Sequence, residues 1–188
     1  MTRDAYPKVG LSIIQARTAA DLDIARMLMR EFVAWHRRTH PADNDQLDVL
    51  FEPGAFETEL ARLGEIYGPP DGTALVAYVD SAPAGCAALR RLDPSCGEIK
   101  RFFVRTDYRN HGIGMALGMA LLEAARKASY RLVRVDTSIR QREAQALYRR
   151  LGFHLTKPYY VVPPALIGWL VFMVIDLEAE KRDWPVSP

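Results

Sequence analysis

The chain has 188 residues, of which 49% are hydrophobic and 26% are charged. This balance suits one globular domain with a single sizeable core and excludes a disordered chain. The formal net charge of +2 is too small to indicate nucleic acid as a partner. We expect one domain over residues 10–180, with flexible termini at 1–9 and 181–188.

The first part of the domain reads as a strand followed by a long helix. Residues 11–17 predict the strand, and apolar residues recurring every three or four positions predict a helix over 22–36. Thr18 or Asp21 can cap the start of this helix, and Pro41 ends it.

Histidine and cysteine residues give no strong sign of a metal or redox site. His36 and His40 are four residues apart, a spacing that could bind metal on a helix, but no convincing third ligand follows. Cys86 and Cys96 are out of register across an expected hairpin, and neither has the setting of a nucleophile. We expect no metal, two packed thiols and, without a signal peptide, a cytoplasmic protein.

A polar, acidic stretch follows the first helix. Residues 41–70 are broken by proline and glycine, with a short amphipathic helix expected at 55–64. From Asp43 to Glu65 there are seven acidic residues against one basic residue, Arg62.

Three strands are predicted next, at 73–80, 84–91 and 97–104, and the turn at 81–85 makes an antiparallel hairpin of the first two. From Glu98 onward the alternation leaves neither face of the third strand purely apolar. A β-bulge in this strand would explain the mixed faces.

The last part of the chain alternates strands and helices. A strand at 131–137 should run parallel to the strand that carries Glu98, because a full helix intervenes. A helix at 141–151 and strands at 154–160 and 167–177 complete the prediction. The apolar run within 161–175 is too short to span a membrane and is interrupted by two prolines.

The most informative stretch joins the third central strand to the next helix. This helix opens on Gly112 and Gly114, so its unpaired N–H groups and positive dipole end face whatever lies above them. Glycine lacks Cβ and lets an anion approach the main chain closely. Arg109 adds a positive charge three residues earlier. The stretch therefore predicts a phosphate or pyrophosphate site.

Three phosphate-binding patterns can be compared with this loop. A Walker loop would need Gly-Lys-Ser/Thr, which does not follow Gly114. The dinucleotide pattern G-x-G-x-x-G fits two glycines but has Leu117 at the third position, although Asp136 is suitably placed for a ribose. The pattern R/Q-x-x-G-x-G/A is matched in full by residues 109–114. In this the chain resembles the GNAT family of N-acetyltransferases.

A second motif supports the resemblance. Residues 144–153 are similar to the family pattern A-x-x-L-Y-x-x-x-G-F, with Tyr148 at its tyrosine, and the likeness spans about 97–176. It implies an α/β GNAT fold, with a central mixed, mostly antiparallel sheet of six to seven strands flanked by about four helices.

The resemblance also implies a reaction: an amine attacks acetyl-CoA directly in a ternary complex, without a metal. Glu98 stands where several family members have a general base, and Tyr148 where the family's tyrosine protonates the leaving sulfur. The alternatives are a Glu98 that pairs with Lys100 or Arg101 and a Tyr148 that only packs.

The same resemblance assigns the coenzyme contacts. The main chain near Phe103 or Val104 would supply an N–H to the developing oxyanion, and the loop would hold the pyrophosphate. Gln141 stands where many members have an asparagine that touches the coenzyme. The expected coenzyme-binding residues are Phe103, Val104, Arg109, Asn110, His111, Gly112, Ile113, Gly114, Met115 and Gln141.

Two other functions stay open from the sequence alone: an acyl-CoA-binding module without catalysis, and a dinucleotide-binding oxidoreductase. The family resemblance implies a small-molecule or peptide amine as partner, is compatible with a homodimer, and gives no reason to expect nucleic acid or a membrane. It also places the acidic 43–65 stretch over the acceptor end of the cleft, so we expect a cationic acceptor.

Overall fold

A central sheet of seven strands organises the molecule, and the computed structural model describes residues 10–179. The expected boundary at 180 and the two termini lie outside these residues. The strand order is β1-β2-β3-β4-β5-β7-β6, and every neighbouring pair is antiparallel except β4 and β5. The strands are β1 (Leu11–Gln15), β2 (Thr73–Val79), β3 (Ala82–Asp93), β4 (Cys96–Val104), β5 (Leu132–Ser138), β6 (His154–Leu155) and β7 (Leu170–Asp176).

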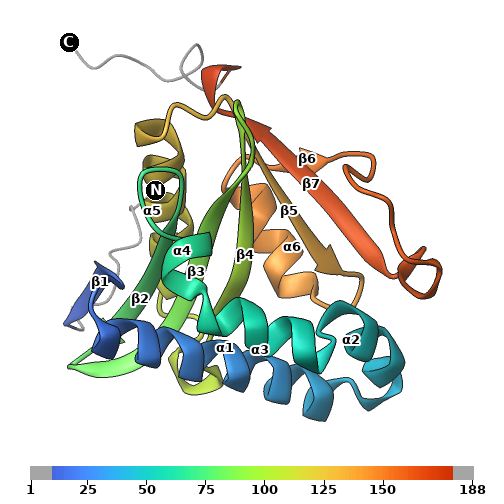
Figure 1. The fold of residues 1–188 in the computed structure, drawn as a ribbon, viewed down its shortest axis with the longest axis horizontal. Coiled ribbons are helices and arrows are strands. Elements are labelled where there is room, and N and C mark those ends of the chain that lie inside the picture. Colours follow the sequence, from blue (N-terminus) through green and yellow to red (C-terminus); the bar gives the residue numbers. More distant parts are fainter. Residues whose placement is uncertain (1–9, 180–188) are drawn as a thin grey trace, which may run out of the picture.

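Helices cover both faces of the sheet. Figure 1 shows α1 to α4 crossing one face, and α5 and α6 lying on the other. Short 3-10 turns lie at Pro41–Asp43, Thr106–Tyr108 and Pro164–Leu166. The helices are α1 (Ala19–Thr39), α2 (Asn44–Leu50), α3 (Pro53–Ala61), α4 (Leu63–Ile66), α5 (Ile113–Lys127) and α6 (Arg142–Arg150).

The predicted elements are present, and the α/β fold class with a mixed, mostly antiparallel sheet is confirmed. Thr18 caps α1 with a reciprocal capping box to Asp21, because its hydroxyl accepts from the Asp21 N–H and the Asp21 carboxylate accepts from the Thr18 N–H. The single helix expected at 55–64 is divided into α3 and α4, and α2 precedes them.

The sheet separates two apolar cores. Ile99 and Val135 pack against α5, whereas Phe103 and Phe172 face the core on the α1 side. Regular alternation would put Ile99 and Phe103 on the same face, and a register shift in β4 between them puts them on opposite faces. Each core is closed by helices from one part of the chain: the 113–150 helices close the first, and the 19–66 helices close the second. The two faces are therefore built by different parts of the sequence.

The predicted bulge in β4 is confirmed. Its pairing with β3 shifts register between Cys86 and Ala88, opposite Phe103 and Lys100, and Arg101 has a φ of 57°. The parallel pairing of β4 with β5 ends at Ile99 and Val135. Beyond this point β4 and β5 separate, and the open wedge between them is where the functional site lies.

The expected strand at 154–160 is wrong for most of its length. His154 and Leu155 pair with β7, and the Thr156 N–H donates once more to the Phe172 carbonyl of β7 at 2.9 Å. Pro158 lacks the N–H that a continuing ladder would need. The following residues cross the sheet as a loop, which brings Tyr159 and Tyr160 against Phe172 of β7.

The sequence analysis expected two packed cysteine thiols and no membrane-spanning segment. Cys86 and Cys96 are free and buried, and burial raises the pKa of the Cys86 thiol to about 12 and that of Cys96 to about 11. Both are therefore protonated, packed thiols. Within residues 10–179, no helix has the length and apolar character that crossing a membrane requires.

Candidate active site

The loop before α5 has the geometry of an anion site. Asn110 has a φ of 64° and Gly112 a φ of 77°, and Gly112 ends the loop as the N-terminal cap of α5. The first turn, Ile113 to Met115, therefore presents main-chain N–H groups that have no partner within the helix. His111 is exposed beside them. These N–H groups match the pyrophosphate site that the sequence predicts, which stays a prediction.

Gly114 has a packing role that the sequence analysis did not assign to it. A Cβ on Gly114 would lie 3.2 Å from Leu147 Cδ2, and a Cβ on Gly118 would overlap Leu151. The two glycines are one turn apart and face α6, so they allow α5 and α6 to pack closely. This contact fixes Tyr148, which lies between Leu147 and Leu151 in α6, relative to the loop.

Arg109 does not point toward the mouth of the loop, which corrects the sequence analysis. Its Nε donates to the Val104 carbonyl at 3.1 Å, and its guanidinium lies 4.2 Å from the centre of the Trp35 ring. Burial lowers the pKa of the Arg109 side chain. The side chain therefore ties the loop to β4 and α1, and the main chain is left to hold an anion.

The main chain of Val104 faces the wedge between β4 and β5. Arg105 N–H donates to the Ala84 carbonyl in β3 at 2.9 Å. Because successive peptide groups of a strand point to opposite sides, the N–H and carbonyl of Val104 point away from β3. The Phe103 side chain packs in the core on the α1 side, so only its main chain could take part in binding at the wedge. Val104 is thus the better placed of the two expected donors.

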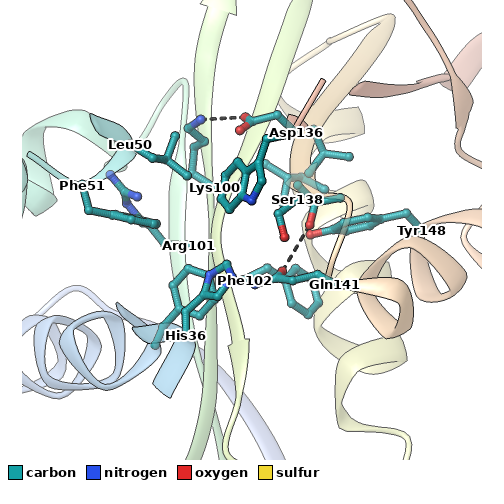
Figure 2. A pocket seen from close by; sticks show the side chains of 15 residues that line it. His36, Leu50, Phe51, Lys100, Arg101, Phe102, Asp136, Ser138, Gln141 and Tyr148 are labelled. Carbon is teal, nitrogen blue, oxygen red and sulfur yellow. Dashed lines mark hydrogen bonds and ion pairs between the residues drawn. The ribbon is translucent and has the colours of Figure 1, made fainter. Parts of the chain in front are cut away.

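A cavity of about 60 Å³ lies in the wedge, and Tyr148 lines it. Figure 2 shows Tyr148 reaching toward the pocket from α6. Its ring packs edge-on against Phe102 with the centroids 5.9 Å apart. Burial raises the pKa of Tyr148 further above its ordinary value. The hydroxyl is therefore protonated at neutral pH, as a general acid requires.

Glu98 lies in a buried ion-pair network beside this cavity. It is 1% exposed, and its carboxylate accepts from Arg90 at 2.6 Å and from the Tyr159 hydroxyl at 2.9 Å. Lys100 Nζ is 3.4 Å away, so the alternative of pairing with Lys100 is observed. Glu98 is not among the described residues that line the cavity.

Asp136 is the carboxylate that reaches the cavity. Its Oδ1 lies 2.7 Å from Lys100 Nζ, a pair marked by a dashed line in Figure 2, and 3.3 Å from the Tyr159 hydroxyl. Burial, followed by the charges of Asp136 and Glu98, raises the pKa of Tyr159, which therefore stays a hydrogen-bond donor. Tyr159 thus links the two carboxylates, with Asp136 on the side of the cavity.

Comparison with known proteins agrees with this geometry. The profile described as "Acetyltransferase (GNAT) family" matches residues 26–153. An uncharacterized N-acetyltransferase of Schizosaccharomyces pombe is 32% identical over 89% of this chain and 96% of its own length. The chain belongs to the GNAT acetyltransferase family.

Other GNAT proteins are similar over shorter stretches or in fold alone. N-alpha-acetyltransferase RimI of Mycobacterium tuberculosis is 37% identical over 63% of this chain and 72% of its own length. N-acetylaspartate synthetase of Rattus norvegicus is 33% identical over 58% of this chain and 38% of its own. PaiA N-acetyltransferase of Thermoplasma acidophilum, solved in complex with coenzyme A, superposes with a TM-score of 0.66 at 16% identity, over 89% of this chain and 99% of its own.

Gln141 lies in the lining of the cavity. Its Oε1 accepts from the Thr137 hydroxyl at 3.1 Å, and its Nε2 lies 3.3 Å from His36 Nδ1. His36 comes from α1 on the other side of the cavity. Gln141 therefore positions a side chain of α1, and its contact with the coenzyme stays a prediction.

The acidic stretch is largely neutralised by ion pairs and a helix cap. Six of its seven carboxylates have partners, and three of these contacts join α2 or α3 to α1 or β4. Five of the carboxylates are paired with an arginine, which reduces the net negative charge on which the expectation of a cationic acceptor depended. The contacts are Asp43–Arg140, Asp48–Arg37, Glu57–Arg30, Glu59–Arg101 and Glu65–Arg62, with Glu52 accepting from the N–H groups of Gly54 and Ala55.

His36, Asp136 and Trp169 are among the cavity residues that the sequence analysis did not assign to the site. Asp136 was considered only as a ribose contact, although its place near the end of the strand parallel to β4 pointed to the wedge. His36 and Trp169 had no local signal, because they meet the cavity only when the two ends of the chain fold against the same sheet.

Proposed function

We propose that this GNAT protein transfers the acetyl group of acetyl-CoA to an amine by direct attack within a ternary complex. The observation that carries the proposal is one small cavity lined by both a protonated Tyr148 and an Asp136 carboxylate paired with Lys100, next to the α5 anion loop. Acetyl-CoA, when bound, supplies an activated thioester. The pyrophosphate would be held by the N–H groups of residues 112–115, and the acetyl end would enter the wedge between β4 and β5.

The reacting groups then have defined proton partners. The amine nitrogen forms a bond to the acetyl carbon while the carbon–sulfur bond breaks. Val104 N–H donates to the carbonyl oxygen as negative charge develops on it. Tyr148 gives its proton to the departing sulfur, and the proton lost by the amine goes to Asp136, directly or through water. After the products leave, Tyr148 takes a proton from solvent and Asp136 releases one to it.

We assign Asp136 rather than Glu98 as the group that meets the amine, and Glu98 as a positioning residue. Lys100 and Tyr159 hold Asp136 in place, while Glu98 holds Tyr159 and Lys100. Asp136→Asn should lower kcat by about 10²-fold and flatten the pH dependence of kcat. Glu98→Gln should lower kcat less and leave the shape of the pH profile unchanged. A flat profile in Glu98→Gln alone would return the base role to Glu98.

The partner that we propose is a small-molecule or peptide amine, met in the cytoplasm. The relatives' names, N-acetylaspartate synthetase and N-alpha-acetyltransferase, are consistent with an amine next to a carboxyl or amide group. A homodimer is compatible with this function, and the proposal does not require one.

The test is release of free coenzyme A from acetyl-CoA with a panel of amines, with the acetylated product identified by mass spectrometry. Transfer to at least one amine is expected, and Tyr148→Phe serves as the matched low-activity variant. Acetyl-CoA binding without any transfer would support the non-catalytic module instead. Preference for NADH over coenzyme A in a titration would support the oxidoreductase.

A further inference from the structure

Two hydrogen-bond donors in the cavity lack an acceptor. His36 Nε2 and Trp169 Nε1 are both buried and have no hydrogen-bond partner among the described residues. The two side chains are 2% and 6% exposed, and their rings lie nearly parallel with the centroids 6.0 Å apart. Both residues line the cavity that contains Tyr148 and Asp136. A buried polar group without a partner costs stability, so such a pair at a cavity calls for a ligand.

The protonation of His36 follows from its neighbours. The Thr137 hydroxyl donates to Gln141 Oε1, so the Gln141 Nε2 group faces His36 and donates to Nδ1 at 3.3 Å. With Nδ1 accepting, the single proton of a neutral imidazole is on Nε2. Burial, together with the charge of His40, lowers the pKa of His36 to about 4 against a small opposing effect of Asp43, so the ring is neutral at physiological pH. His36 therefore presents an N–H, as the indole of Trp169 does.

The two donors belong to the acceptor side of the cavity. His36 comes from α1, and Trp169 from the segment that leads into β7. Both contribute to the core on the face opposite α5, whose N-terminus forms the anion loop. Figure 2 shows His36 close to Gln141 and on the opposite side of the pocket from Tyr148. An oxygen bound here would belong to the amine substrate rather than to the coenzyme.

We propose that His36 Nε2–H and Trp169 Nε1–H bind a carboxylate or amide oxygen that the acceptor carries next to its amine. This inference rests on the proposed acetyl transfer and names its substrate class, an amino acid or the N-terminus of a peptide. Two N–H donors without a hydrogen-bonded acceptor among the described residues favour an sp² oxygen over a plain alkyl chain, because the chain would leave both donors unpaired.

The test compares three acceptors that differ only in the group on the carbon that bears the amine: a carboxylate in leucine, a carboxamide in leucinamide and a hydrogen in 3-methylbutylamine. The same trio can be used for other amino acids. We expect kcat/KM for the oxygen-bearing members to exceed that of the plain amine by at least about tenfold, as losing a buried hydrogen-bond partner implies. Equal values for acid and amide would identify a carbonyl oxygen, and preference for the acid a carboxylate. Preference for the plain amine would overturn the proposal.

Variants of His36 and Trp169 show whether these two donors cause the preference for oxygen-bearing acceptors. Trp169→Phe keeps a ring and removes the N–H, so it should lower kcat/KM about tenfold for the oxygen-bearing acceptors and leave that of the plain amine unchanged. His36→Phe should act in the same direction. His154→Phe, the same change at an exposed position of β6 outside the cavity lining, is the matched control and should have no effect. An equal loss with all three acceptors would mean that the donors serve the thioester or only the fold.

A binding measurement separates this inference from the proposed function. Calorimetric titration of the panel's acids and amides into the protein saturated with coenzyme A detects the site even in the absence of turnover. Binding that is weakened in folded Trp169→Phe would support the donor pair even if no acetyl transfer occurred. Absence of binding to every acid and amide, or equal binding by the variant, would overturn it.

Discussion

The two sides of the cavity are built by different means. On the coenzyme side, a stretch of ten residues, 109–118, provides the loop, the exposed main-chain N–H groups and the glycines that seat α6. On the acceptor side, the groups come from α1, β5 and the segment before β7, and His36 and Trp169 are 133 residues apart in the chain. Main chain forms the first side, and side chains form the second.

This difference has a physical consequence for specificity. A pyrophosphate can be bound by N–H groups of any sequence that has the right backbone conformation, because main-chain donors are always present. An acceptor must be distinguished from other amines, which requires particular side chains held by other side chains. The chain Thr137–Gln141–His36 is such a support, and its loss would leave the coenzyme side intact.

The largest effect expected on the acceptor side concerns acid stability. The native pKa of His36 is about 4, below its unfolded value of 6.5. Both states hold a neutral ring above pH ~6.5, and on acidification the unfolded chain binds a proton first, so stability falls until pH ~4. Relative to His36→Phe, the wild-type protein should lose about 3 kcal/mol of unfolding free energy across this window.

Urea unfolding at pH 7, 5.5 and 4 measures this difference, since other titrating groups cancel between the two proteins. A constant difference for His36→Phe would show that the ring is accessible to water and protons.

Tyr148 lies where the two sides meet, and its hydroxyl tests whether they cooperate. Tyr148→Phe keeps the edge-on contact with Phe102 and removes only the O–H. Turnover should fall about 10²-fold while acetyl-CoA affinity changes little. Steady-state kinetics together with calorimetry gives both values. Unchanged turnover in the variant would make Tyr148 a packing residue.

The coenzyme side should respond to a change of backbone or charge at one position. Gly112→Asp places a carboxylate at the start of α5, where φ is 77°, and should weaken coenzyme A binding by about tenfold or more. Gly112→Asn is the matched variant of similar shape without charge and should lose less. Calorimetry on both separates charge from strain, and full affinity in a folded Gly112→Asp would show that the phosphates bind elsewhere.

The smallest expected effect is that of ionic strength on the KM for a cationic acceptor. Because six of the seven carboxylates at 43–65 are already bonded, KM for a polyamine should change by less than about twofold between low and physiological ionic strength. Asp45→Asn, at an exposed position of α2, should likewise leave KM unchanged. A KM that rises several-fold with salt would restore the acidic stretch as an attractor of cations.

Some parts of the fold and of the candidate site could be predicted from the sequence, and others could not. The α5 loop and Tyr148 were predicted because each signal is contiguous, and the bulge in β4 because its faces were mixed. Arg109 was misplaced because a local motif does not reveal that Trp35, seventy-four residues earlier, offers a ring for its guanidinium. His36 and Trp169 could not be predicted, since an unpaired donor exists only when every neighbour has been placed.

The early end of the β4–β5 ladder has one more consequence. Ile99 and Val135 are the last paired residues, so the N–H of Val104 faces the wedge without a strand beside it. Its amide hydrogen should exchange with deuterium faster than those of the paired residues 96–99, and it should become protected when acetyl-CoA occupies the wedge. The gap that admits the ligand thus places a rapidly exchanging strand amide a few residues from protected ones within β4.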